Sequence, residues 1–156
     1  KVENKKKHGV LAYIGQVMRE YKVHRINATI DCGGKSYSGE FALIMFVKSP
    51  RCFGFNFNKA FDEESMSGHL LAIRSPKHDG LLGKIEMFAP FFRAFFLGLK
   101  KERDGNIIFR QAYSATVTHD AAVDYCRDGE KHTVDSGEHK IKFIRSLCNF
   151  SVIEKF

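Results

Sequence analysis

The sequence lacks several patterns that would assign a common class of protein at once. Its 156 residues contain no apolar run near the ~18 residues needed to cross a bilayer, so we expect no membrane-spanning segment. No Gly-x-Ser-x-Gly motif is present, which removes the usual signature of a serine hydrolase. The four cysteines stand far apart, with no Cys-x-x-Cys pair and no histidine pair at zinc-binding spacing. We therefore expect reduced cysteines in a cytoplasmic protein.

One short segment, CGGKS at Cys32–Ser36, matches the end of a phosphate-binding loop. The complete pattern requires a glycine where this chain has Thr29, and a helix after the loop. The flanking residues instead predict strands, with Gly33-Gly34 as a hairpin turn. We therefore exclude a phosphate loop and expect no ATP hydrolysis by this chain alone.

The composition is that of one globular domain with a net positive charge. Apolar residues make up 44% of the chain and include 15 phenylalanines, which favours a packed core over disorder. Lysine and arginine outnumber aspartate and glutamate by 25 − 18 = 7, which favours phosphates, acidic lipid headgroups or nucleic acid as partners. The most basic aromatic strand, KIKFIR at 140–145, is equally typical of a solvated strand face, so we expect no nucleic-acid binding. Because the chain starts at Lys1 without methionine, we expect it to be a piece of a longer protein.

Hydrophobic periodicity predicts helices near Gly9–Tyr21 and Leu81–Leu99. Pro90 is expected to kink or divide the second helix. The Phe-rich stretch 88–96 has the spacing of a helix face that packs in a core or at a domain interface, and a lipid-facing surface is the alternative. The first helix carries its apolar stripe at Leu11, Ile14, Val17, Met18 and Tyr21.

In most of the remaining chain, apolar and polar residues alternate with period two or apolar residues form short runs. Both patterns are typical of strands. Asp-Gly and Ser-Gly pairs separate several of these strands and predict turns. Many short strands with glycine turns indicate a mainly β fold, an antiparallel β-sandwich with two or three accessory helices. The predicted strands are 26–30, 41–47, 69–75, 107–118, 122–126, 139–146 and 149–153, with 49–67 as loop and turns at 104–105, 128–129 and 136–137.

Five segments, taken in order, resemble the C-terminal domain of the diacylglycerol kinase family, which includes bacterial diacylglycerol kinases and sphingosine kinases. Each motif is common by itself, and their order and spacing over nearly the whole chain carry the resemblance. The segments are GVLAY (9–13), GEFALIMFV (39–47), FGFNFNKAFDE (53–63), HLLAI (69–73) and CRDGE (126–130).

The resemblance implies that residues 1–156 are a single β-sandwich domain, the lipid-substrate half of an ATP-dependent lipid kinase. Its partner would be an upstream nucleotide-binding domain of the same protein, absent here, with the active site between the two. ATP and Mg²⁺ would be cofactors of the full-length enzyme, while this fragment would need none and be inactive by itself. The resemblance also implies a cytoplasmic protein peripheral to the membrane that holds its substrate lipid there, and it leaves a homodimer open.

Three departures from the family pattern affect the predicted sites. Asn58 stands where the family often has proline, and Arg127 stands where an apolar residue is usual. The usual Asp-Asp-Gly has become Asp62-Glu63-Glu64-Ser65. Since that segment helps to hold a structural magnesium ion in bacterial members, only Asp62 is carried over as a predicted metal ligand.

The Asp-Gly-Glu sequence at 128–130 matches the family, so the resemblance makes Glu130 and Asp128 the predicted catalytic residues. Asp128-Gly129 would make the bend that fixes the Glu130 carboxylate. Glu130 could then act as a general base, accept hydrogen bonds from a ribose or from water around a metal, or be ordinary hairpin surface. The alternatives to a lipid kinase are a non-catalytic module that binds anionic lipid surfaces and an NAD-kinase-like C-terminal domain.

Overall fold

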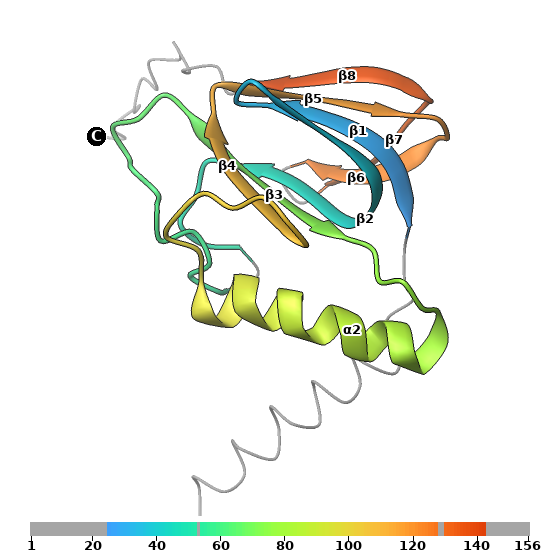
Figure 1. The fold of residues 1–156 in the computed structure, drawn as a ribbon. Coiled ribbons are helices and arrows are strands. Elements are labelled where there is room, and N and C mark those ends of the chain that lie inside the picture. The colour runs from blue at the N-terminus through green and yellow to red at the C-terminus, as the bar shows by residue number, and fades with distance from the viewer. Residues whose placement is uncertain (1–24, 53, 128–129, 143–156) are drawn as a thin grey trace, which may run out of the picture.

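The computed structural model describes residues 25–52, 54–127 and 130–142, and Figure 1 shows their arrangement. Strands dominate, with one α-helix that passes directly into a short π-helix. In chain order the elements are β1 (Ile26–Cys32), β2 (Lys35–Val47), β3 (Gly68–Arg74), α2 (Gly80–Phe92), the π-helix η1 (Arg93–Leu97), β4 (Ile107–Ala112), β5 (Ser114–His119), β6 (Val123–Arg127), β7 (Glu130–Val134) and β8 (Gly137–Lys142).

The main sheet has six antiparallel strands in the order β4-β3-β2-β1-β5-β8, and β6 and β7 form a separate two-stranded sheet. Strand β2 joins the two halves of the main sheet. Its residues 35–41 pair with β1, its residues 41–47 pair with β3, and the register shifts between Phe41 and Leu43. A bulge of this kind bends a strand and increases its twist. The sheet therefore curves, and its two halves enclose a common core.

Two hydrophobic clusters lie on opposite faces of β3, which explains why the sequence HLLAI is apolar without alternation. Leu70 and Ala72 belong to the cluster inside the curved sheet, together with residues of β1 and β5 such as Ile30. Leu71 and Ile73 belong to the second cluster, which includes phenylalanines from η1 and from the loop before β3. The helical segment thus covers the outer face of β3 and β4 (Figure 1).

The structure confirms the predicted mainly β, antiparallel, sandwich-like fold and the helix predicted near Leu81–Leu99. Pro90 does not divide that helix, because α2 continues to Phe92. The backbone takes π-helical geometry at Arg93, three residues after Pro90. A proline lacks the N–H that would bond to the preceding turn, which weakens the regular hydrogen-bond ladder of the helix at this position.

Several predicted boundaries differ from the observed ones. The segment predicted as one strand over 107–118 is two strands, β4 and β5, separated at Tyr113. Strand β7 was not predicted, because EKHTV is polar at four of its five positions and lacks an apolar alternation. Strand β8 is described as far as Lys142. The helix predicted near Gly9–Tyr21 and the strand predicted over 149–153 lie outside the described residues.

Within the described part of the chain, no helix has both the length and the apolar character required to cross a bilayer.

Candidate functional site

The hairpin of β6 and β7 carries the predicted catalytic residue Glu130 as the first residue of β7. Glu130 pairs with Arg127 across the hairpin, so only two residues connect the strands. A two-residue connection is the geometry that an Asp-Gly turn favours. Asp128 and Gly129 themselves lie outside the described residues, and the catalytic assignment of Asp128 stays a prediction.

One face of the hairpin presents a carboxylate beside an imidazole. The Glu130 side chain is 82% exposed, and its Oε2 lies 3.8 Å from Nε2 of His132. The His132 ring stacks on Tyr125 of the opposite strand, with 5.3 Å between the ring centroids. The stacking limits the directions in which His132 can turn. A carboxylate in this position can accept a proton or a hydrogen bond from a hydroxyl group that approaches from solvent.

The other face of the hairpin holds the two strands in register. Asp124 Oδ1 accepts a 2.7 Å hydrogen bond from the Thr133 hydroxyl, and Asp124 Oδ2 lies 2.8 Å from the Lys131 ammonium. Lys131, and then Thr133, hold the pKa of Asp124 below its ordinary value. Such cross-strand pairs stabilise a sheet, and an isolated two-stranded hairpin is only marginally stable in water. These contacts therefore help to fix the strand that carries Glu130.

Asp62 lies in the loop between β2 and β3, far in sequence from the hairpin. Its Oδ1 accepts a 3.0 Å hydrogen bond from the backbone N–H of Glu64, a local turn contact. In the described part of the chain, no three metal-binding side chains gather in one place. Protein sites for Mg²⁺ often use one or two carboxylates with several waters, so Asp62 stays a predicted ligand. No step proposed below depends on it.

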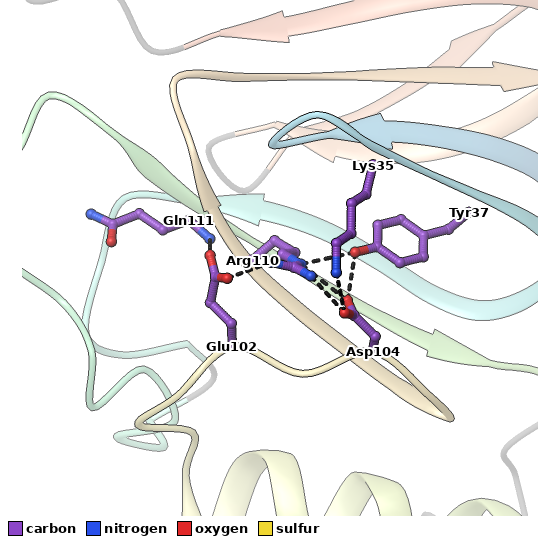
Figure 2. A network of polar contacts seen from close by, with 6 residues as sticks. All are labelled: Lys35, Tyr37, Glu102, Asp104, Arg110 and Gln111. Atoms are coloured by element: carbon purple, nitrogen blue, oxygen red, sulfur yellow. Dashed lines mark hydrogen bonds and ion pairs between the residues drawn. The ribbon is translucent and has the colours of Figure 1, made fainter.

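A polar network that the sequence did not reveal lies at the end of the main sheet (Figure 2). Asp104, in the loop before β4, is its centre. The Asp104 carboxylate accepts hydrogen bonds from the Lys35 ammonium at 2.7 Å and from the Tyr37 hydroxyl at 2.5 Å. Arg110 of β4 donates to the same carboxylate at 2.5 and 3.0 Å, and also pairs with Glu102. Strands β2 and β4 are thereby tied to the loop between η1 and β4.

The acidic and basic groups of this network compensate one another's charge. Hydrogen bonds from Lys35, Tyr37 and Arg110 hold the pKa of Asp104 well below its usual range. Burial, and then the Asp104 carboxylate, raise the pKa of Tyr37. The Arg110 pKa is raised, chiefly by Asp104, so this guanidinium stays charged. The acidic and basic groups of the network already hydrogen-bond to one another. This indicates that the network holds β2, β4 and the loop before β4 in place.

Two open grooves flank the network, and Glu102 lines both of them. The larger, of about 750 Å³, lies between Phe88 and Phe92 of α2 and the loop before β4. The smaller, of about 530 Å³, is lined by polar groups that include Ser67 and Gln111. Glu130 lines neither groove. These two grooves therefore lie apart from the predicted catalytic carboxylate.

Sequence reasoning interpreted Asp104-Gly105 only as a turn and gave Arg110 no role. No local signal could have joined them to Tyr37, which is 67 residues from Asp104 and 73 from Arg110 in the sequence. The structure brings Arg110, Asp104 and Tyr37 together through strand order. The structure does not bring Asp62 and Glu130 together: among the described residues, no hydrogen bond or ion pair connects them.

Comparisons with known proteins agree with the resemblance at the level of fold. No protein-family model matches the chain. The curated proteins include no significant match. Among solved structures, a diacylglycerol kinase from Bacillus anthracis str. Sterne superposes with a TM-score of 0.51 and 13% identity, covering 83% of this chain and 44% of that one. This chain has the fold of part of that protein.

Two further structures from the same strain also match. Both are named as diacylglycerol kinases whose activity is not yet established. Their TM-scores are 0.55 and 0.56, at 14% and 15% sequence identity. They cover 83% and 81% of this chain, which in turn spans 41% of each. The chain thus corresponds to about two fifths of the structures that it matches. At these identities the likeness concerns the fold alone.

Proposed function

We propose that this chain is the C-terminal, lipid-substrate half of an ATP-dependent lipid kinase that transfers phosphate to the hydroxyl of a diacylglycerol-like lipid. The observation that carries the proposal is the fold shared with structures named as diacylglycerol kinases, over more than four fifths of this chain. The order of the sequence motifs, ending in Asp-Gly-Glu at 128–130, supports the same assignment independently of the superposition.

The partial coverage of the matched structures supports a second domain. Because the chain spans only 41–44% of those proteins, we propose that an upstream nucleotide-binding domain of the same protein completes the enzyme. That domain would bind ATP with Mg²⁺, which supplies the phosphoryl group. This fragment by itself would be inactive, since its sequence holds no phosphate-binding loop.

Glu130 is the residue that we propose for catalysis. Its carboxylate is exposed at the first position of a strand whose register is held by the Asp124 contacts. There it would accept the proton of the lipid hydroxyl, whose oxygen forms the new bond to phosphorus while the bond to the leaving oxygen of ADP breaks. Phosphoryl transfer depends mainly on positioning and charge stabilisation. A carboxylate held at the end of a short hairpin meets the positioning requirement.

The test compares Glu130→Gln with Glu138→Gln in the longer chain that includes the upstream domain. Glu138 is also an exposed strand glutamate, on β8, and serves as the matched control. We expect Glu130→Gln to lower lipid phosphorylation about 10²-fold or more, which is the usual effect of losing a general base. Glu138→Gln should keep full activity. Both melting temperatures should stay within about 2 °C of the parent, because surface substitutions usually change stability by less than about 0.5 kcal/mol.

Each alternative gives a different result. Full activity of Glu130→Gln would make Glu130 hairpin surface and refute its catalytic role. Phosphorylation of NAD but of no lipid by the longer chain would identify the NAD-kinase-like alternative. Binding to anionic vesicles without any phosphorylation would identify a lipid-binding module and overturn the kinase proposal.

A further inference from the structure

An exposed apolar stripe runs along α2 and η1, and two of its residues, Phe88 and Phe92, also line the larger groove described above. The stripe consists of five residues at spacings of four, three, four and four, which places them on one side of a helix. Phe88 and Phe92 stack with ring centroids 5.7 Å apart, and Phe92 and Phe96 with centroids 5.0 Å apart. The exposed fractions of the stripe residues are 73% for Leu81, 57% for Ile85, 46% for Phe88, 39% for Phe92 and 50% for Phe96.

Of the stripe residues, Phe96 also packs on Phe55 beside the second core cluster, with 4.7 Å between the ring centroids. The buried residues of α2 and η1 are Gly83, Met87, Ala94 and Phe95, of which Ala94 and Phe95 belong to the second core cluster. Contiguous exposed apolar surface of this extent usually marks a binding surface. The stripe is therefore a candidate binding surface.

Arg25, the first described residue, contacts the N-cap of this helix. Arg25 precedes β1, and its guanidinium donates to Asp79 Oδ1 at 2.8 Å and to Glu40 Oε2 at 2.7 Å. It also lies 3.4 Å from the His78 carbonyl oxygen. Asp79 is the N-cap residue of α2. Any segment that ends at residue 24 is thus delivered to the N-terminal end of the stripe.

Residues 8–22 have the pattern and length to cover the stripe. Their predicted apolar positions, which include Leu11, Ile14 and Tyr21, also fall on one helix side. At 1.5 Å per residue, a helix of this length measures about 22 Å, and the 13 residues of α2 measure about 20 Å. Because Arg25 contacts the N-cap of α2, a helix over residues 8–22 that docks on the stripe would run antiparallel to α2.

We propose that residues 8–22 form a helix that docks on the exposed stripe of α2 and η1. Antiparallel alignment from the Arg25 anchor places Tyr21 near Leu81, Val17 and Met18 near Ile85, Ile14 near Phe88, and Leu11 near Phe92. The tether favours this occupant over a second copy of the chain, because a short linker gives an effective concentration in the millimolar range. The inference is independent of the proposed kinase function, since it concerns packing within one chain.

The first experiment tests the register by disulfide formation in a Cys126→Ser background, which removes the one exposed thiol among the described residues. Ile14→Cys combined with Phe88→Cys is the matched pair, and Ile14→Cys combined with Leu81→Cys is the mismatched pair. Positions 81 and 88 are about 10 Å apart along a helix, whereas a disulfide requires Cβ atoms about 4 Å apart. We expect a several-fold higher yield of the intrachain disulfide from the matched pair. Equal yields, or a mainly intermolecular product, would overturn the proposal.

The second experiment uses the absence of tryptophan from the sequence. Phe92→Trp places the single tryptophan of this sequence in the stripe, and acrylamide quenching of the tryptophan fluorescence measures its exposure. Adding Ile14→Asp should raise the quenching constant several-fold, while adding Gln16→Asp, on the opposite side of the predicted helix, should leave it unchanged. Equal quenching in all three proteins would contradict docking. Shielding that depends on protein concentration would assign the stripe to a second copy, and shielding only with anionic vesicles would assign it to a membrane surface. Either result would overturn the proposal.

Discussion

His69 is a buried polar residue whose replacement by phenylalanine we expect to stabilise the domain. It lies on β3, is 2% exposed, and stacks on Phe109 of β4 with ring centroids 5.2 Å apart and ring planes 15° apart. Among the described residues, neither His69 ring nitrogen has a hydrogen-bond partner. Phe at this position keeps a flat ring against Phe109 and removes both unpaired polar atoms.

The expected gain follows from two opposing effects. Burying a polar group without a partner costs about 1–3 kcal/mol in protein mutational data. The slightly larger phenylalanine ring must fit a closely packed core, and overpacking costs about 1–3 kcal/mol when neighbours cannot move. Since the ring shape is kept, we expect the first effect to exceed the second and to leave about 1 kcal/mol of stabilisation at pH 7. For a domain of this size that raises the melting temperature by about 2–4 °C.

The gain should grow as the pH falls. Burial lowers the pKa of His69 from its ordinary value of 6.5, and the nearby Glu102 carboxylate opposes this only in part. Below about pH 6.5 the unfolded chain takes up a proton that the folded chain resists, so the parent protein loses stability from this residue on acidification. Phenylalanine does not titrate. The difference in stability between His69→Phe and the parent should therefore widen from pH 7 to pH 5.

Urea unfolding at pH 7 and pH 5 measures both effects. His69→Gln is the control, because it keeps a polar group in the site and loses the ring stacking, and it should be less stable than the parent at pH 7. A His69→Phe protein that is less stable than the parent at pH 7 would refute the reasoning. It would mean that the ring nitrogens of His69 have a hydrogen-bond partner, such as an ordered water. Losing that hydrogen bond would then cost more free energy than removing the buried ring nitrogens gains.

Two further perturbations test the loop between η1 and β4. Gly98 has φ of 73°, and a Cβ built there would lie 2.8 Å from Cε of Lys59 and 3.1 Å from the Asn56 carbonyl oxygen. Gly98→Ala should therefore lower the free energy of unfolding by about 1–3 kcal/mol, measured by thermal unfolding. Gly105→Ala is the control and should be neutral or slightly stabilising, because a Cβ there meets nothing within 4 Å. Equal effects of the two substitutions would contradict this prediction. Asp104→Asn removes a carboxylate whose pKa is lowered, chiefly by Lys35. Such a group stabilises the fold above its ordinary pKa of 3.8, and this contribution is lost as the pH falls below that value. The variant should therefore be less stable than the parent at pH 7. Below pH 4 its free energy of unfolding should fall less steeply with pH than that of the parent. Asp31→Asn, an exposed strand aspartate, should leave the acid unfolding curve of the parent unchanged, and an Asp104→Asn curve that coincides with it would refute the role of the network.

The hairpin that carries Glu130 shows how local sequence can specify local structure. The two-residue connection agrees with the Asp-Gly pair, and β6 begins one residue after its predicted start. The polar segment EKHTV could be recognised as a strand only through its pairing with β6. The catalytic role of Glu130 remains a prediction from the family resemblance, because a carboxylate on an exposed hairpin looks the same in a site and on a surface.

Periodicity alone predicted the class of the fold, the helix near Leu81–Leu99 and most of the strands. These features depend on which side chains alternate or recur along a few residues, and that information is contained in short segments. The bend in β2 was not predictable, since the shift between Phe41 and Leu43 depends on two different partner strands.

Only the tertiary structure decided which distant polar groups meet and which apolar face the described sheet and loops leave exposed. Strand order places Arg110 and Asp104 beside Tyr37, although more than 60 residues separate them from it in the sequence. The sequence showed α2 and η1 as a broad apolar surface, but the packing on β3 and β4 decided that Phe95 is buried while Phe96, its neighbour, is 50% exposed. Periodicity marks the faces of an element, and only the positions of all the other elements decide which face is buried.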